Sequence, residues 1–371
     1  MKKSLIALAV LAASGAAMAQ SSVTLYGVAD AGVTYLNGAD NWSGVTSGNN
    51  LASLIGFRGV EDLGGGLKAN FVLEADVNLD TGAGKYLDAG DGKYGATDSG
   101  FRFKRQSTVG LAGNFGAVRL GRELTAAYNA TARYDVFGSV GIARSQLWDD
   151  GKNLDTTTFA DPYHYTTDRR VSNAITYVSP NFSGFKAAVN YGFGEMAGKN
   201  RDGRYFGGGL TYDNGPLSLG LGAERLNNGA GAAMQVQASN DITAWSLGGS
   251  YDLGVAKLLA GYRQSTAKDV LGLGDLKNRG YMLAATAPVG PGLVRAAYNR
   301  YEAKFDGEKG VTDQFGLGYV YNLSKRTSVY GTYAYIKNKN DNALNLTVNS
   351  YGGVKSNGSQ QAVQVGVTHA F

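Results

Sequence analysis

The 371-residue chain contains no cysteine, only two histidines and only five prolines. The lack of cysteine excludes disulfides and thiolate metal sites. The sequence also has no G-x-S-x-G motif and no metal-ligand spacing. A hydrolase built from a serine, an acid and His164 is the one enzymatic alternative, since His369 falls on the apolar side of a predicted strand. We therefore predict that the chain is not an enzyme, with no catalytic residue, no metal and no cofactor.

Long hydrophobic runs and strong charge are absent as well. Beyond the amino terminus, no segment approaches the run of about 20 apolar residues that a membrane-spanning helix needs. The net charge is +5 and there is no basic tract, which argues against nucleic acid as a partner. The chain is instead rich in glycine (55) and tyrosine (23). Its mean hydropathy of −0.19 suits apolar residues spread over alternate positions.

The amino terminus predicts export. Two lysines and a short apolar core precede Ala17-Met18-Ala19, the pattern of a cleaved secretory signal. A buried N-terminal helix is the alternative. We predict a signal peptide over residues 1–19 and one mature domain over residues 20–371.

The carboxyl terminus predicts a membrane-spanning strand. Val363, Val365, Val367, His369 and Phe371 alternate with small or polar residues, so one face of the strand is mostly apolar. Outer-membrane barrels commonly end in this way, because the last strand pairs with the first and places an aromatic residue at the membrane interface.

Runs with alternating apolar residues recur along the whole chain, with almost no helical pattern between them. We expect sixteen strands, at about 23–35, 51–60, 67–79, 101–112, 117–123, 170–179, 184–193, 205–213, 217–226, 242–252, 255–264, 279–287, 292–303, 313–322, 327–336 and 360–371.

The connections between these runs alternate between short and long. Turns such as Gly113-Asn-Phe-Gly116 and Pro180-Asn-Phe-Ser183 are short. Polar stretches at about 36–50, 80–100, 124–169, 194–204, 227–241, 265–278, 304–312 and 337–359 separate the resulting hairpins. A soluble β-sandwich would mix its loop lengths, and a β-helix would show a fixed short repeat. We predict an all-β fold: a 16-stranded antiparallel transmembrane β-barrel with short periplasmic turns and long extracellular loops. Sixteen strands leave an aqueous channel.

Several segments resemble the general-porin family of β-proteobacteria and Neisseria. They are Val23–Gly32, Gly56–Ala69, Arg105–Leu111, Leu120–Glu123 and Arg170–Pro180. The resemblance runs over the whole mature length. It implies a homotrimer in the outer membrane of a Gram-negative bacterium, among lipid and lipopolysaccharide, with each barrel passing small hydrophilic solutes. In such barrels the terminal aromatic, here Phe371, is also read by the assembly machinery.

The same resemblance implies that the third long loop, about 124–169, folds into the pore. Carried over by position, the basic wall of the constriction would comprise Arg58, Arg105 and Arg170, with Arg102 and Arg122 as further candidates. Glu74 and, in the loop, Asp135 would supply acidic groups. Alternation supports inward positions for Arg58 and Glu74, but it places Arg105 on the parity of Val109 and Leu111.

Basic residues facing acidic ones would create a transverse field across the passage, and we expect a weak preference for anions. The alternatives left open are a channel specific for a sugar or an organic anion and, from another class, an adhesin or receptor that uses its loops.

Overall fold

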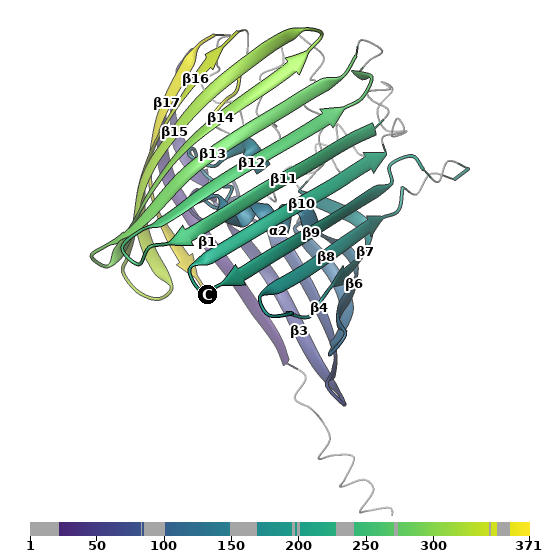
Figure 1. Cartoon of the computed structure of the whole chain (residues 1–371). Coiled ribbons are helices and arrows are strands. Elements are labelled where there is room, and N and C mark those ends of the chain that lie inside the picture. Colours follow the sequence, from purple (N-terminus) through teal and green to yellow (C-terminus); the bar gives the residue numbers. More distant parts are fainter. Residues whose placement is uncertain are drawn as a thin grey trace, which may run out of the picture.

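The computed structural model describes residues 22–82, 84, 101–148, 169–194, 197–198, 201–227, 241–270, 274–340, 343–346 and 357–371. The predicted signal peptide lies outside these ranges. The described strands form one continuous antiparallel sheet that closes on itself (Figure 1).

The strands follow one another around the barrel in chain order. Their bounds are β1 Ser22–Asn37, β2 Asn41–Ser47, β3 Leu54–Gly64, β4 Leu67–Asp76, β5 Gln106–Gly113, β6 Gly116–Leu124, β7 Arg170–Val178, β8 Phe185–Gly192, β9 Tyr205–Asn214, β10 Leu217–Asn227, β11 Asp241–Asp252, β12 Lys257–Ala267, β13 Leu276–Val289, β14 Gly292–Phe305, β15 Glu308–Asn322, β16 Thr327–Lys339 and β17 Ser359–Ala370.

Two of these seventeen strands share one position in the barrel wall. β1 pairs with β17 along one edge. Along its other edge, β1 pairs with β3 near the periplasmic end and with β2 near the opposite end. β2 and β3 therefore form a single interrupted strand, and the barrel has sixteen positions. The predicted 16-stranded antiparallel barrel is confirmed.

Three details of the predicted strand map were wrong. The connection at 36–50 was predicted as a loop, but it contains β2. The connection at 304–312 is a two-residue hairpin turn, in which Asp306 (φ 45°) and Gly307 (φ 84°) both take positive φ, as a type I′ turn requires. The strand predicted to begin at residue 101 begins at Gln106.

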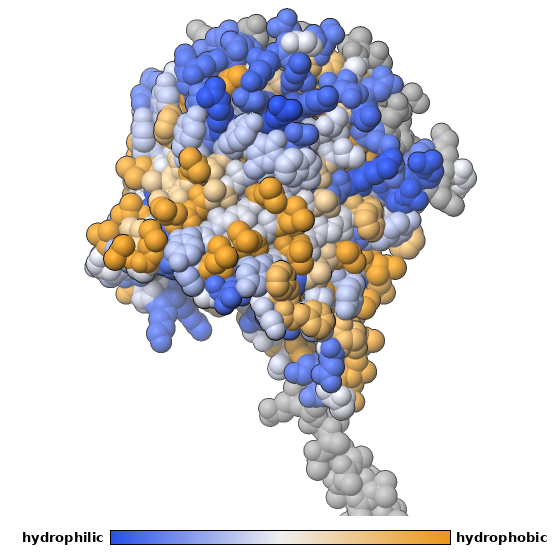
Figure 2. All heavy atoms as spheres, viewed as in Figure 1, coloured by the Kyte–Doolittle hydropathy of each residue, from blue (hydrophilic) through white to orange (hydrophobic). Residues whose placement is uncertain are grey.

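Side chains alternate between the two faces of the wall as the sequence predicts. In β17, Val363 and Val365 point outward and are 47% and 58% exposed, whereas Gln364 and Thr368 point inward and are 2% and 3% exposed. Figure 2 shows hydrophobic side chains gathered over the lower part of the barrel and hydrophilic ones toward the loop end. An apolar outer band beneath a polar rim is the surface that a bilayer requires.

The hydrophobic core lies inside the barrel, between the third loop and the wall. The loop contains helix α2 (Ala126–Thr131) and the 3₁₀ turns η2 (Ala132–Tyr134) and η3 (Gln146–Trp148). Its side chains Tyr134, Phe137 and Ile142 pack in one buried cluster with wall residues that include Met282 and Ile336. In the part of the chain that the structure describes, no helix is long and apolar enough to cross a membrane.

The terminal aromatic residue closes the barrel by resting on a glycine. Gly27 and Phe371 exchange two backbone hydrogen bonds, of 3.1 and 3.0 Å. A Cβ atom added at Gly27 would overlap the Phe371 ring and the Leu54 carbonyl oxygen. The first strand therefore provides a seat that has room for the ring only because residue 27 is glycine.

We predict that Gly27→Ala destabilises the closed barrel by about 1–3 kcal/mol, because the Phe371 ring must leave its seat. The midpoint temperature at which the folded band disappears from a denaturing gel measures this loss. Gly331→Ala is the matched control, since a Cβ at this outward-facing position meets nothing within 4 Å. Equal midpoint temperatures for the two variants would contradict the claim that packing of the Phe371 ring on Gly27 stabilises the barrel.

Candidate functional site: the constriction of the channel

The third loop enters the barrel through helix α2. Thr125 caps the helix, since its side chain accepts a hydrogen bond from the Tyr128 N–H at 3.2 Å. The Ala126 N–H donates to the side-chain oxygen of Asn190, on the inward face of β8. At the other end, Thr131 and Ser246 of β11 are linked through their hydroxyl groups at 3.0 Å. Both ends of the helix are thus fixed to the inner wall.

Inward-facing glycines let the loop lie directly on the wall. A Cβ atom at Gly209 or Gly220 would overlap the backbone of α2, and one at Gly248 would overlap the Tyr134 ring. A Cβ atom at Gly316 would overlap the Ala143 side chain and crowd the Phe137 ring. Glycine in a strand often marks such a close approach of another segment. Alternation along a strand can place a glycine on the inner face, but it does not indicate which segment will pack against it.

Asp135 organises the loop from within. Its carboxylate accepts the backbone N–H groups of Phe137, Ser139 and Ser145, each at 2.9 Å. Asp135 itself is only 6% exposed. The sequence predicts an acidic side chain of the constriction here, whereas the structure places its carboxylate inside the fold of the loop. The other loop acids, from Asp149 to Asp161, lie outside the described residues.

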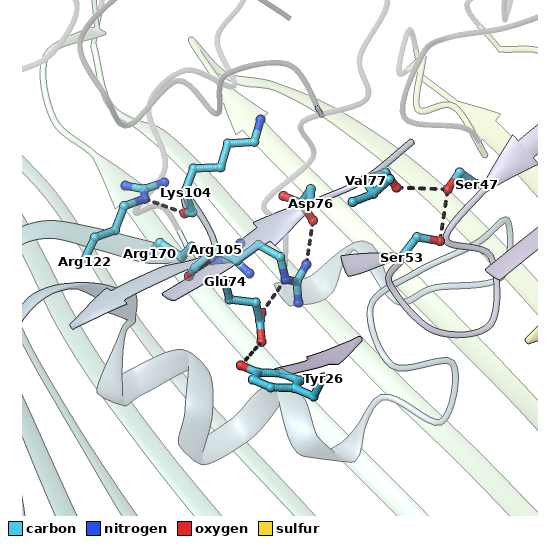
Figure 3. A network of polar contacts seen from close by, with 10 residues as sticks. All are labelled: Tyr26, Ser47, Ser53, Glu74, Asp76, Val77, Lys104, Arg105, Arg122 and Arg170. Carbon is cyan, nitrogen blue, oxygen red and sulfur yellow. Dashed lines mark hydrogen bonds and ion pairs between the residues drawn. The ribbon is translucent and has the colours of Figure 1, made fainter. Parts of the chain in front are cut away.

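Arg105 and two acids form the centre of the opposite wall (Figure 3). The Arg105 guanidinium reaches Glu74 Oε1 at 2.5 Å and Asp76 Oδ1 at 2.7 Å. The second oxygen of Glu74 accepts a hydrogen bond from the Tyr26 hydroxyl at 3.1 Å. Alternation places Arg105 on the outward parity, and this fails because Arg105 precedes the first residue of β5 and is not bound by its pleat.

Two of the predicted arginines hold the segment that carries Arg105. Arg122 donates to the Lys104 carbonyl at 2.7 Å and to the Ser172 hydroxyl at 2.7 Å. Arg170 donates to the Arg105 carbonyl at 2.8 Å. Figure 3 shows these side chains converging on the Lys104–Arg105 segment just before β5. Arg102 is exposed and stands just before this segment, where its carbonyl accepts the Lys104 N–H.

Arg58 lies on the inner face of β3, as alternation predicts. It is opposite Thr24 of β1 and Val72 of β4, on the same face as Glu74. Its guanidinium stands 5.1 Å from the centre of the Tyr26 ring. Arg58 is exposed although it points into the barrel, so the interior beside it is accessible to solvent.

The described part of this network carries more positive than negative charge. Together with Arg58 on the Tyr26 ring, it holds five cations (Arg58, Lys104, Arg105, Arg122 and Arg170) and two carboxylates (Glu74 and Asp76), a net charge of +3. Burial opposes the charge of Arg105, but the neighbouring carboxylates of Asp76 and Glu74 outweigh it and raise its pKa. Arg105 therefore stays charged, and it engages both acids.

Sequence reasoning assigned no role to Asp30, which is the most densely bonded carboxylate near the seam. It is fully buried in β1 and accepts the backbone N–H groups of Asn49, Asn50 and Leu51 at 2.7–3.3 Å. Thr368 of β17 and Tyr330 of β16 donate to it as well. The break between β2 and β3 thus folds around this one side chain. The sequence shows Asp30 within the Val23–Gly32 segment, but it does not show the hydrogen-bond donors Tyr330 and Thr368, which come from distant strands.

The Asn49 end of this break also touches the third loop. A Cβ atom at Gly141, in the loop, would overlap the Asn49 carbonyl. The Asn49 side-chain oxygen accepts a hydrogen bond from Gln364 at 2.8 Å. Asp30 therefore supports the Asn49 backbone against which Gly141 of the third loop lies. Among the described residues, no cluster of three or more acidic or histidine side chains could hold a metal ion.

Comparisons with known proteins agree with this geometry. A family model described as Gram-negative porin matches residues 5–341. Outer membrane porin protein 32 of Delftia acidovorans is 44% identical, with both chains covered completely. The chain belongs to the Gram-negative porin family. It is an outer-membrane porin, and the prediction of a channel rather than an enzyme is confirmed.

Further relatives extend the same picture. A major outer membrane protein P.IB of Neisseria lactamica is 31% identical over 88% of this porin and 91% of the relative. The solved structure of an anion-selective porin from Comamonas acidovorans superposes with a TM-score of 0.79, at 40% identity, over 95% of this porin and all of that chain. OmpT of Vibrio cholerae in a trimer form shares the fold, with a TM-score of 0.63 and 17% identity over 95% and 99% of the two chains.

We predict that Gly220→Ala lowers the single-channel conductance of this porin. The added methyl group overlaps the Ala130 carbonyl oxygen of α2, so it costs about 1–3 kcal/mol unless the helix moves toward the lumen. Gly208→Ala on the neighbouring strand is the control, because its Cβ would meet only ordinary contacts at 3.6 and 3.7 Å. An unchanged conductance in Gly220→Ala would show that α2 does not limit the passage.

Proposed function

We propose that this porin is a water-filled channel for small hydrophilic solutes and ions with a weak preference for anions. One observation carries the sign of that preference. Arg105 occupies both carboxylates of the network, which leaves Arg58 and Arg122 without an acidic partner among the described residues. A narrow passage with low-dielectric walls concentrates ions of the opposite charge.

The arrangement favours a general channel over one specific for a sugar. A sugar site would need several polar groups aimed at one ligand. In the described network, Arg122 and Arg170 each donate to a backbone carbonyl oxygen, of Lys104 and Arg105 respectively. The anion-selective porin from Comamonas acidovorans, 40% identical in sequence, supports the same sign of charge.

Replacing Arg58 and Arg170 together by Ser should shift the zero-current potential in a salt gradient toward that of a cation-preferring channel. Arginine is charged at all working pH values, so its removal takes away fixed positive charge from the wall. The shift should shrink at high salt because the Debye length falls to about 3 Å at 1 M.

The control is Arg225→Ser with Arg279→Ser, which removes two arginines that face away from the lumen. It should leave the zero-current potential unchanged. A double Arg58 and Arg170 variant that kept the parent preference at low salt would show that these arginines do not set the selectivity.

We also propose that the porin assembles as a homotrimer through the outward faces of β1 and β17. Across the middle of these faces the side chains are small or aliphatic, including Val33, Val365 and Val367, which are 46–60% exposed. Tyr35 and Phe371 mark the two ends of this face, and other outward faces carry further aromatics such as Trp245 and Tyr281. A continuous exposed aliphatic patch of this kind can pack against protein as well as against lipid.

Val365→Trp should convert trimers to monomers, because an indole cannot fit within a packed interface. Leu283→Trp is the matched control: it is equally exposed and outward-facing on β13, where lipid accommodates the larger ring. The mass of the detergent-solubilised protein distinguishes the two. A trimeric Val365→Trp variant would place the interface elsewhere.

Three further proposals concern the export of the porin, its assembly and the lipid around it. We propose that residues 1–19 are removed on export, that Phe371 is read by the barrel assembly machinery, and that lipopolysaccharide surrounds the lipid-facing wall. The exposed Phe371 ring at the periplasmic end of the seam supports the second proposal. The polar outer rim shown in Figure 2 supports the third.

A further inference from the structure

Three lysines form a row across neighbouring strands on the outer face of the wall. Lys277 of β13 lies directly opposite Lys304 of β14, and Lys304 lies directly opposite Lys309 of β15. All three are exposed. They share the outward face with Tyr281 and Leu283, which are 41% and 63% exposed. The row lies near the loop end of the strands, just below the Asp306–Gly307 turn.

This row is unfavourable for the fold by itself. Like charges directly opposite each other on one face of a sheet repel and destabilise the pairing. Lys309 forms a salt bridge with Glu302 Oε1 at 3.0 Å. In the ranges that the structure describes, no carboxylate lies within salt-bridge distance of Lys277 or Lys304. Two adjacent ammonium groups without a counter-charge are arranged as a site for an anion supplied from outside the chain.

The side chains below the row indicate that the anion belongs to the lipid headgroup layer. Four residues along β13 from Lys277, or about 13 Å, Tyr281 packs against Tyr262 with ring centres 5.2 Å apart. Tyr262 in turn packs against Trp245 at 4.9 Å. Half-exposed aromatics at this level mark the boundary between headgroups and hydrocarbon. The lysine row therefore stands at headgroup height on the side that faces lipid.

An apolar groove continues from the aromatic shelf into the hydrocarbon level. Its volume is about 720 Å³, and it opens on the outer face of β9–β13. Its lining includes Leu219, Leu221, Leu247, Tyr262, Tyr281 and Leu283. Figure 2 shows hydrophobic side chains gathered over this face, below the hydrophilic rim. A groove that reaches these aromatic rings, with the lysine row beyond them toward the loop end, matches a molecule with an acyl chain, a sugar and a phosphate.

We propose that Lys277, Lys304 and Lys309 bind the phosphate groups of a phosphorylated glycolipid of the outer leaflet, the lipid A part of lipopolysaccharide, whose acyl chain lies in the groove below. The inference rests on the proposed contact with lipopolysaccharide and gives that contact a site. Lysine ammonium groups bind phosphate as point charges, and Tyr262 and Tyr281 lie at the level of the sugar.

The test uses the full-length porin purified in detergent and titrated with lipid A, with bound lipid counted by native mass spectrometry. The variant Lys277→Gln with Lys304→Gln should bind lipid A about tenfold more weakly or worse, because each basic group near an anionic lipid surface contributes about a factor of five. Lys257→Gln with Lys325→Gln removes two lysines at the periplasmic end and should bind as the parent does.

Two other ligands distinguish a lipid-bound phosphate from free phosphate as the occupant of the site. Dephosphorylated lipid A should bind the parent as weakly as lipid A binds the Lys277 and Lys304 variant, and inorganic phosphate should not displace lipid A. Equal affinity of parent and variant for lipid A would overturn the site. Displacement of lipid A by inorganic phosphate would show that the three lysines bind free phosphate and not the lipid. Conductance recorded from the same preparations reports on the channel separately, so a failure of the proposed selectivity would not be mistaken for a failure of this site.

Discussion

The structure depends on one constraint: in hydrocarbon, every backbone N–H and C=O group of the wall must find its partner within the wall. A sheet meets this requirement only if its last strand pairs with its first. Here that seam is the β1–β17 ladder, which ends in the two hydrogen bonds between Gly27 and Phe371. Asp30 lies on the inner side of the same seam and ties β1 to β16 and β17 through Tyr330 and Thr368.

A closed barrel of this size has a wet interior, and the third loop divides that interior unequally. Inward-facing glycines such as Gly209 and Gly220 place no side chain between the wall and the loop. The loop therefore packs against that side of the wall, where it forms an apolar cluster. The described wall of β3–β7 keeps its polar side chains, and Arg58 remains exposed. We propose that the charge preference of the channel arises from this asymmetry, since ions would pass along the side that the loop does not cover.

Most of the barrel follows from a side-chain period of two, which is why the strands, their alternation and the inward position of Arg58 could be predicted from sequence. The failures occur where the period stops. Arg105 stands before its strand, and Asp306 and Gly307 make a turn too tight to resemble the loop predicted there. Asp135 and Asp30 are beyond sequence reasoning for another reason: their roles depend on backbone N–H groups brought to them by folding.

The resemblance of the motifs supplied the list of constriction residues, but only the structure shows their separate duties. Arg105 binds acids, Arg122 and Arg170 hold the backbone of Lys104 and Arg105, and Arg58 faces the solvent. The central claim is that the uncovered wall carries net positive charge. The zero-current potential of the unaltered porin in a planar bilayer, at a tenfold gradient of dilute potassium chloride, tests it most directly. We expect a modest potential with the sign of chloride preference; a potential of the opposite sign would contradict the account.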